Sequence, residues 1–238
     1  AADIEMEKRS GLKKTKLGWL PNDWEIEPLK NIGAIGSGST PSKDNEKFWK
    51  DGKIPWLPTG KVNDKIISSS QTFLTQFAIE KKSIKLLPID TILIAMIGQG
   101  KAALLKINAW VNQNFAYIIP KDLVSSKYLF LFLDFKYQRI RYEGKRGGSQ
   151  GSLNIGIVKY LKIALPIYEE QKAIAKCLSA WDTAITIRTR LVAEKEHLKM
   201  ALMQQLLSGK KRLPGFDGKW EEKRIEDIAS EYSKKNER

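Results

Sequence analysis

The forty residues from Glu169 to Ser208 (169 to 208 inclusive) contain neither glycine nor proline, and this stretch constrains the fold most strongly. It opens with acidic residues and stops at Gly209, which three basic residues follow, so both helix-end signals are present. Its apolar residues recur at intervals of three and four, which predicts one long amphipathic helix. The apolar seam comprises Ile174, Leu178, Trp181, Ile185, Val192, Leu198 and Leu202.

Such a helix needs a long partner. At ~1.5 Å per residue it would span about 60 Å, whereas a small domain has a radius of gyration of only about 13 Å per 100 residues. The other helical pattern, residues 125–141, has at most 17 residues and is too short to match it. We therefore expect an antiparallel coiled coil with a second copy of the chain, a homodimer being the simplest form. The alternative is one bent helix folded back on its own domain.

Charge indicates the kind of partner. The 238 residues carry 41 Lys+Arg and 27 Asp+Glu, a formal net charge of +14, which favours a polyanion such as nucleic acid. The long helix has six basic and five acidic residues, so the remainder carries +13. One cysteine, Cys177, permits no internal disulfide, and with one histidine, His197, it cannot build a His/Cys zinc site. We expect no metal and no bound cofactor.

No stretch predicts a membrane span or an export signal. The most apolar run, residues 89–97, is far shorter than the roughly 20 residues that a bilayer requires, and it is typical of a buried strand. The N-terminal residues are polar and charged, without the apolar core of a signal peptide. We expect a cytoplasmic location and no membrane partner.

Short apolar runs separated by Gly, Pro, Ser and Asn predict a β-rich domain before the helix, and the fold class is α+β. Residues 144–152 are a loop by composition. A repeat then sets the domain limits: Trp24-Glu25 with Leu29 and Ile32 recurs 196 positions later as Trp220-Glu221 with Ile225 and Ile228. Chance is the alternative for so short a match. We expect an N-terminal arm (1–16), a β-rich domain (17–168), the helix (169–208), and the start of a second repeat or a C-terminal tail (209–238).

Traces of catalysis are weak. No phosphate-binding loop is present, and the pattern Gly36-Ser37-Gly38 lacks the third glycine of a dinucleotide fold. A metal-dependent nuclease using Asp90 and Lys101 is the alternative hypothesis, although Gln99 would then replace a carboxylate ligand. A third interpretation makes the chain an assembly scaffold whose basic charge is incidental. We predict no catalytic residue.

Polar and basic loop residues are the candidates for DNA contact. The segment from Lys136 to Lys162 is the most basic, and a Gly-rich loop flanked by cations can approach phosphates closely. Asn and Gln pair with adenine edges, and Arg and Lys pair with guanine edges. The predicted DNA-binding residues are Ser39, Thr40, Ser42, Lys43, Lys61, Asn63, Gln99, Lys101, Asn112, Gln113, Asn114, Arg139, Arg141, Lys145, Arg146, Ser149 and Gln150.

The start of the long helix resembles a known family. Pro166, then Glu170-Gln171 and Ile174-Ala175, is similar to the helix start of HsdS, the specificity subunit of type I restriction-modification systems. The resemblance extends over about residues 18–238. Further pieces that agree with it are Trp24-Glu25, Gly38-Ser39-Thr40-Pro41-Ser42, Phe48-Trp49, Ile54-Pro55-Trp56, Leu86-Leu87-Pro88 and Asn112-Gln113.

The resemblance implies a non-catalytic subunit that reads double-stranded DNA. Residues 17–168 would be a target-recognition domain, and residues 169–208 would be the spacer helix that also docks methyltransferase subunits and, through them, a restriction subunit. S-adenosylmethionine would bind the methyltransferase partner. Family members carry two such domains and two helices, whereas this chain has one complete domain and one helix. A homodimer would therefore read a palindromic target.

Overall fold

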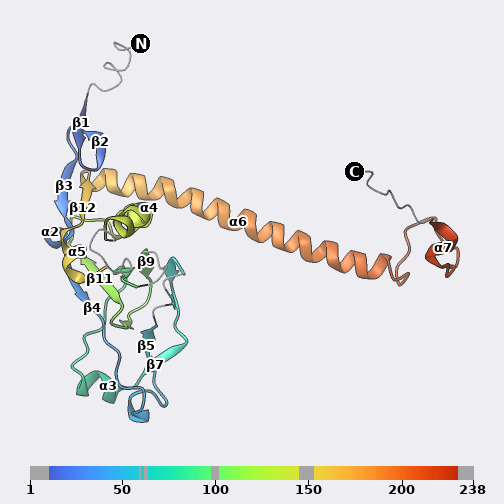
Figure 1. The fold of residues 1–238 in the computed structure, drawn as a ribbon, viewed down its shortest axis with the longest axis horizontal. Coiled ribbons are helices and arrows are strands. Elements are labelled where there is room, and N and C mark those ends of the chain that lie inside the picture. The colour runs from blue at the N-terminus through green and yellow to red at the C-terminus, as the bar shows by residue number, and fades with distance from the viewer. Residues whose placement is uncertain (1–10, 59, 62–63, 98–101, 145–152, 230–238) are drawn as a thin grey trace, which may run out of the picture. The chain divides into compact units, whose positions relative to one another are not determined.

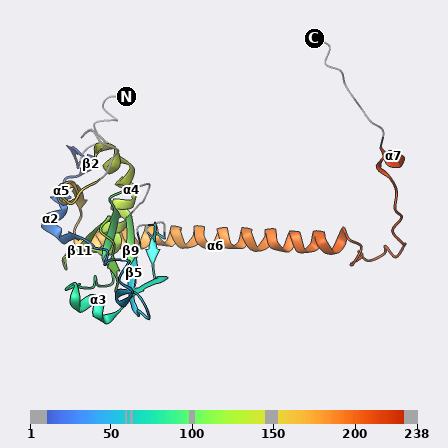
Figure 2. The same ribbon diagram turned by 60° about the horizontal axis from the view of Figure 1, so that its bottom comes forward.

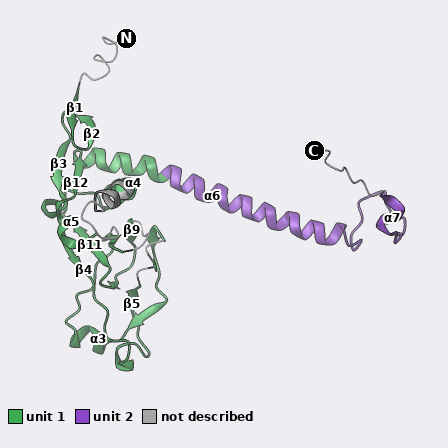
Figure 3. Ribbon diagram, in the orientation of Figure 1, with its two compact units in different colours: residues 1–179 green, residues 180–238 purple. Residues whose placement is uncertain are grey.

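The computed structural model describes residues 11–58, 60–61, 64–97, 102–144 and 153–229, and of residues 137–144 it describes only the backbone (Figure 1). The chain divides into two units, residues 1–179 and residues 180–238, which Figure 3 colours separately. Each unit is taken by itself. Every strand of the described residues belongs to the first unit, which is therefore the β-rich domain that the apolar runs predict.

A five-stranded sheet organises the first unit. Its order is β4-β11-β8-β9-β6, and all neighbours are antiparallel except β6 and β9, which are parallel. The most apolar run of the sequence forms its central strand, as predicted. The strands are β4 (Gly33–Ser37), β6 (Ile66–Ile67), β8 (Ile92–Ala95), β9 (Ala102–Leu105) and β11 (Phe115–Pro120).

Both faces of this sheet are buried. Successive side chains of a strand point to opposite faces, so Ile92 and Ile94 of β8 enter one core while Leu93 and Ala95 enter another. This explains why β8 is apolar at every position instead of alternating. Three helices contribute to the first core, and Figures 1 and 2 both show α4 beside β9. The helices are α2 (Leu29–Ile32), α4 (Ser126–Gly144) and α5 (Ile155–Tyr160).

A three-stranded sheet lies at the second core, in the order β10-β5-β7. Strand β5 pairs parallel with β10 and antiparallel with β7. Two short helices flank β5 and β7 along the chain, one before β5 and one after β7. Thr75 caps the second helix by accepting a hydrogen bond from the Ala78 amide. The elements are η1 (Glu46–Phe48), β5 (Ile54–Leu57), β7 (Thr72–Leu74), α3 (Gln76–Lys81) and β10 (Trp110–Val111).

Two antiparallel pairs complete the first unit. Strand β3 (Glu25–Pro28) pairs with β12 (Lys162–Leu165), which joins the beginning of the domain to its end. Strand β1 (Leu12–Thr15) pairs with β2 (Gly18–Pro21). Residues 12–15 therefore form part of a hairpin, although the polar sequence suggested an arm through residue 16. The Thr15 hydroxyl stabilises the turn by donating to the Gly18 carbonyl at 2.7 Å.

The long helix is present as α6 (Tyr168–Leu206), one residue earlier at its start and two residues shorter at its end than the glycine-free stretch predicts. Gly209 has φ +71°, in the left-handed region that glycine adopts at low cost, and the Lys211 amide donates to the Gln205 carbonyl at 3.0 Å. The second helical prediction, residues 125–141, is confirmed as α4. Within the described ranges, no helix combines the length and apolar character that a membrane span needs.

The sequence repeat has a counterpart in backbone conformation. The short helix α7 (Ile225–Ile228) occupies the positions 196 residues after α2. The residues before the two helices, Pro28 and Arg224, are both extended, with φ/ψ of −73°/144° and −75°/154°. After each helix the next amide donates back to its first residue, Leu29 or Ile225. The two segments thus share one local structure.

Candidate nucleic-acid interface

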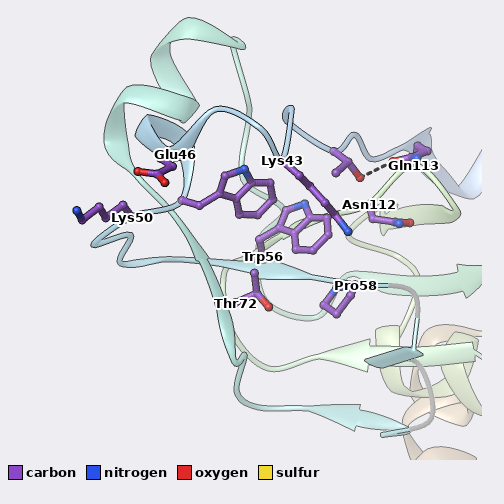
Figure 4. A pocket seen from close by; sticks show the side chains of 10 residues that line it. Lys43, Glu46, Lys50, Trp56, Pro58, Thr72, Asn112 and Gln113 are labelled. Carbon is purple, nitrogen blue, oxygen red and sulfur yellow. Dashed lines mark hydrogen bonds between the residues drawn. The ribbon is translucent and has the colours of Figure 1, made fainter.

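A hollow of about 870 Å³ opens beside the three-stranded sheet, and most of the described candidate residues gather around it (Figure 4). Three segments form its walls: the loop after β4, the region from η1 to β7, and the turn after β10. The lining residues are Thr40, Lys43, Glu46, Trp49, Lys50, Trp56, Pro58, Thr72, Asn112 and Gln113.

The loop after β4 is held close to the end of β10. The Ser39 amide donates to the Val111 carbonyl at 2.9 Å, and a Cβ added to Gly38 would lie 1.9 Å from that same oxygen. Only glycine fits at position 38, because any side chain would overlap the backbone of Val111. The Gly-Ser pair therefore fixes the path of residues 39–43 and does not contribute to a dinucleotide loop.

Three tryptophans hold this loop through their indole N–H groups. Trp49 donates to the Ser42 carbonyl at 2.9 Å, Trp56 to the Ser39 carbonyl at 3.2 Å, and Trp110 to the Ser39 hydroxyl at 3.1 Å. The rings of Trp49 and Trp56 meet edge to face, with centroids 5.2 Å apart. The result is a rigid aromatic wall that positions the polar groups of the loop.

The amide side chains after β10 are also fixed. The Thr40 hydroxyl donates to Oε1 of Gln113, and a dashed line marks this bond at one edge of the hollow in Figure 4. Oδ1 of Asn112 accepts from the Asn114 amide at 2.7 Å, and the Asn112 amide donates to the Leu57 carbonyl at 3.2 Å. These bonds tie the turn at residues 112–114 both to the loop after β4 and to β5.

Charge at the hollow is mainly positive. Lys43, Lys50 and Glu46 are exposed lining residues, and neither lysine forms an ion pair with any described residue. Glu46 and Lys50 lie on one side in Figure 4, whereas Lys43, Asn112 and Gln113 lie on the other. An open concave surface with unpaired cations, fixed amides and an aromatic wall is suited to a polyanion that carries hydrogen-bonding groups.

The structure brings seven predicted residues to this region. Thr40, Lys43, Asn112 and Gln113 line the hollow, while Ser39, Ser42 and Asn114 make the hydrogen bonds that position it. Lys61 pairs with Asp64 and is not a lining residue.

The other predicted contacts fall on residues whose side chains the structure does not describe. Arg139 and Arg141 belong to α4, where the structure describes the backbone alone. The remaining candidates lie outside the described residues and stay predictions: Asn63, Gln99, Lys101, Lys145, Arg146, Ser149 and Gln150.

Sequence reasoning missed six of the ten lining residues as site residues: Glu46, Trp49, Lys50, Trp56, Pro58 and Thr72. Trp49 and Trp56 stand in segments singled out for the family resemblance, but nothing in the sequence shows that they meet. The available signal was the two tryptophans that closely follow a Gly-Ser-rich loop.

Only one member of the proposed nuclease pair, Asp90, lies within the described residues. Asp90 Oδ1 lies 2.6 Å from Lys106 Nζ, and Lys101 lies outside the described residues. Among the described side chains, no group of three or more His, Cys, Asp and Glu is placed to hold a metal ion.

The start of α6 is anchored within the first unit by a buried amide. Gln171 accepts from the Ser125 amide at 2.9 Å and donates to the carbonyls of Pro166 at 2.9 Å and Leu123 at 3.3 Å. The Glu-Gln helix start noted in the sequence thus joins α6 to the residues before α4 and after β12.

The sequence matches a known protein family. A family model described as the type I restriction modification DNA specificity domain matches residues 21–196, which include the hollow and most of α6. The chain belongs to this family. The HsdS resemblance seen in the sequence is therefore confirmed, and the α+β class follows with it.

Named relatives are type I specificity subunits. The MjaIX subunit of Methanocaldococcus jannaschii is 35% identical over 178 residues, covering 73% of this chain and 41% of that protein. The EcoR124I/EcoR124II subunit of Escherichia coli is 29% identical over 190 residues, covering 76% and 47%. The HsdS subunit of Thermoanaerobacter tengcongensis has a similar fold, with a TM-score of 0.60 and 15% identity over 86% of this chain and 50% of that one. This chain thus spans about half of the length of the specificity subunits that it matches.

The apolar seam of α6 is largely uncovered. Ile174 is half-buried, near Tyr128 and Phe132, in an apolar hollow of about 330 Å³ within the first unit. Leu178, Trp181, Ile185, Val192, Leu198 and Leu202 are exposed, Trp181 by 68%. The helix of this specificity domain thus presents the apolar stripe that the seam predicts.

Proposed function

We propose that this chain is a non-catalytic, sequence-specific DNA-reading unit of a type I restriction-modification enzyme. The observation that carries the proposal is the hollow: within the region that matches the specificity domain, it gathers fixed amides and unpaired lysines on one rigid surface. Base edges are read by side chains held in a defined geometry, which the three indole hydrogen bonds provide here.

Electrostatics supports a phosphate-binding role for the same unit. The chain carries a net charge of +14, of which the near-neutral long helix accounts for only one charge. Lys50, at the rim of the hollow, is placed to contact phosphate, and each such contact adds to the salt dependence of binding. The predicted cations of residues 139–146 would extend this surface.

We further propose that α6 sets the spacing of a two-fold assembly. Its exposed seam matches what an antiparallel partner helix would cover, and a second copy of the chain supplies such a helix. The same helix would dock methyltransferase subunits, which would carry S-adenosylmethionine, and a restriction subunit would join through them. The target of a homodimer would be palindromic.

Selection from a randomised duplex pool tests DNA reading. The chain, alone or with a co-expressed type I methyltransferase subunit, is expected to enrich one sequence. Gel shifts with the enriched duplex should weaken steeply as salt rises. Binding that enriches no sequence under either condition would contradict the proposal, and salt-independent binding or none at all would favour the scaffold interpretation.

Sedimentation equilibrium at micromolar concentration tests the assembly. We expect a mass near twice the 27.0 kDa of the chain. The double variant Trp181→Ser, Ile185→Ser should sediment as a monomer, because both exposed seam residues would lose their apolar contacts. The control Thr183→Ala changes a residue on the opposite face of α6 and should leave the dimer intact. A monomeric wild-type chain would contradict the self-paired form.

A further inference from the structure

The hydrogen bond between Thr40 and Gln113 limits what Gln113 can recognise. The Thr40 hydroxyl donates to Oε1 of Gln113, so this amide oxygen is engaged within the protein. Nε2 of Gln113 makes no hydrogen bond to any described residue, and the Gln113 side chain is exposed at the rim of the hollow. What Gln113 presents to a ligand is therefore chiefly an N–H donor.

The groups beside Gln113 have the same character. Lys43 lies on the same side of the hollow, and its ammonium group can only donate. The Asn112 oxygen is engaged by the Asn114 amide at 2.7 Å. Glu46, a pure acceptor, lies on the opposite side with Lys50. On this side of the hollow, the Lys43 ammonium group and Nε2 of Gln113 are therefore the donors that face a ligand.

Guanine and adenine present different hydrogen-bonding groups to such a surface. In the major groove guanine presents two adjacent acceptors, O6 and N7, whereas adenine presents one acceptor and the N6 amino donor. A glutamine that reads adenine with both of its groups needs its oxygen for that amino group. The oxygen of Gln113 already accepts from Thr40 and is less available to the adenine amino group, so the fit to guanine is better than the fit to adenine.

We propose that Gln113 and Lys43 read a guanine in the major groove by donating to its O6 and N7, and that Thr40 is the positioning residue that selects guanine over adenine. This inference rests on the proposed DNA-reading function. It adds the identity of one base and assigns a specificity role to a threonine that needs no contact with DNA.

Selection from the randomised duplex pool tests the inference with four variants of the full chain. Gln113→Leu should lower the preference for guanine at one position by about tenfold while the rest of the motif persists. Thr40→Val releases Oε1 of Gln113, so the preferred base at that same position should change from guanine to adenine. Thr40→Ser retains the hydroxyl and should keep guanine. Gln76→Leu, a matched change on α3 away from the hollow, should leave every position unchanged.

A modified base sharpens the test. Replacing the guanine with 7-deazaguanine removes N7, one of the two proposed acceptors, so wild-type binding should weaken about tenfold. A double variant, Lys43→Met with Gln113→Leu, lacks both proposed donors and should lose much less. Circular dichroism of each variant reports on folding. Because Gln113 is exposed, its substitution should leave the fold intact.

The outcomes separate the two proposals. If the wild type enriches no sequence, DNA reading fails and the guanine assignment fails with it. If the wild type enriches a sequence that Gln113→Leu leaves unaltered, or if the Gln113-dependent base is not guanine, the inference is overturned while DNA reading stands. Loss of guanine preference in Thr40→Ser would equally overturn the positioning role of Thr40.

Discussion

The short helices α2 and α7 have the same sequence pattern and the same backbone conformation, yet the apolar side chains of α2 are buried and those of α7 are exposed. Leu29 and Ile32 of α2 are 0% and 5% exposed, whereas Ile225 and Ile228 of α7 are 79% and 69% exposed. Strand β3, directly before α2, pairs with β12, whereas residues 221–224 before α7 form no strand. The local pattern determines the turn of helix, and a neighbouring strand and core determine whether it is buried.

The contrast also separates two kinds of apolar residue in this chain. Those of the first unit stabilise a fold, and those exposed on α6 and α7 are available to a partner. Substitutions at matched positions should therefore differ in cost between buried and exposed surroundings.

The largest difference is expected between the equivalent residues Leu29 and Ile225. Leu29→Ala should lower the free energy of unfolding of the first unit by about 2–5 kcal/mol, because it leaves a cavity in the first core. Ile225→Ala should change it by no more than about 0.5 kcal/mol. Urea denaturation of both variants measures this difference. Equal losses of unfolding free energy would contradict the contrast between the buried α2 and the exposed α7.

Two glutamines of α6 provide a second matched pair. Gln171→Ala should cost about 2–3 kcal/mol, because the Ser125 amide and the Pro166 and Leu123 carbonyls lose their partner in a buried place. Gln204→Ala, on an exposed turn of the same helix, should be nearly neutral. Denaturation midpoints report the difference. A costly Gln204→Ala would show that the far end of α6 is also covered in solution.

Alkaline pH should weaken the first unit through Tyr128. Burial, and secondarily the charge of Glu170, raises the pKa of the Tyr128 phenol above its ordinary value of about 10. The folded state therefore favours the neutral phenol, so this contribution is fully present below pH 10 and is lost as pH rises further. Tyr128→Phe should cost about 1 kcal/mol at pH 8, since the hydrogen bond to the Ala164 carbonyl is lost, and should flatten the alkaline decline.

Urea titrations at pH 8 and pH 11 test this linkage. Tyr160→Phe, at an exposed tyrosine, is the control and should follow the wild type. An alkaline decline that is equally steep in Tyr128→Phe would refute the role of the buried phenol.

The smallest expected effect is on the salt dependence of DNA binding, and it should differ between a lysine of the first unit and a lysine of the second. Lys50→Ala at the hollow should make the plot of log affinity against log salt less steep by about one unit. Lys195→Ala, on the exposed part of α6, should leave the slope unchanged. Gel shifts across a salt series measure both slopes, and a fall for Lys195→Ala alone would place the phosphate contacts on the helix.

Elements defined by local signals could be predicted well from the sequence. The glycine-free stretch gave α6 within two residues, and the aromatic periodicity of residues 125–141 gave α4. The hairpin of β1 and β2 was missed, because β1 is mostly polar and the turn depends on Gly18 with φ +111°. Residues 83–87, an apolar run, form only a single bridge between Leu87 and Ala109.

The candidate site could be predicted only in part. Thr40, Lys43, Asn112 and Gln113 carry polar groups in loops, which the sequence reveals directly. Trp49 and Trp56 come from different elements and meet only when β5 pairs within its sheet, so no local pattern could place them beside Thr40. Nor could the sequence distinguish residues that face the hollow from Ser39 and Ser42, whose polar groups hold the indoles.

Because the five-stranded sheet is buried on both faces, the proposed DNA reading depends on the loops around it. Because β8 and β9 have a core on either side, their side chains are buried and cannot contact DNA. Their residue types are therefore constrained by packing. In the loops at residues 39–45 and 112–114, the constraints are the close approach at Gly38 and the hydrogen bonds of the indoles. Under the proposed function, altering a few loop residues would change the target while the scaffold that presents them stays constant.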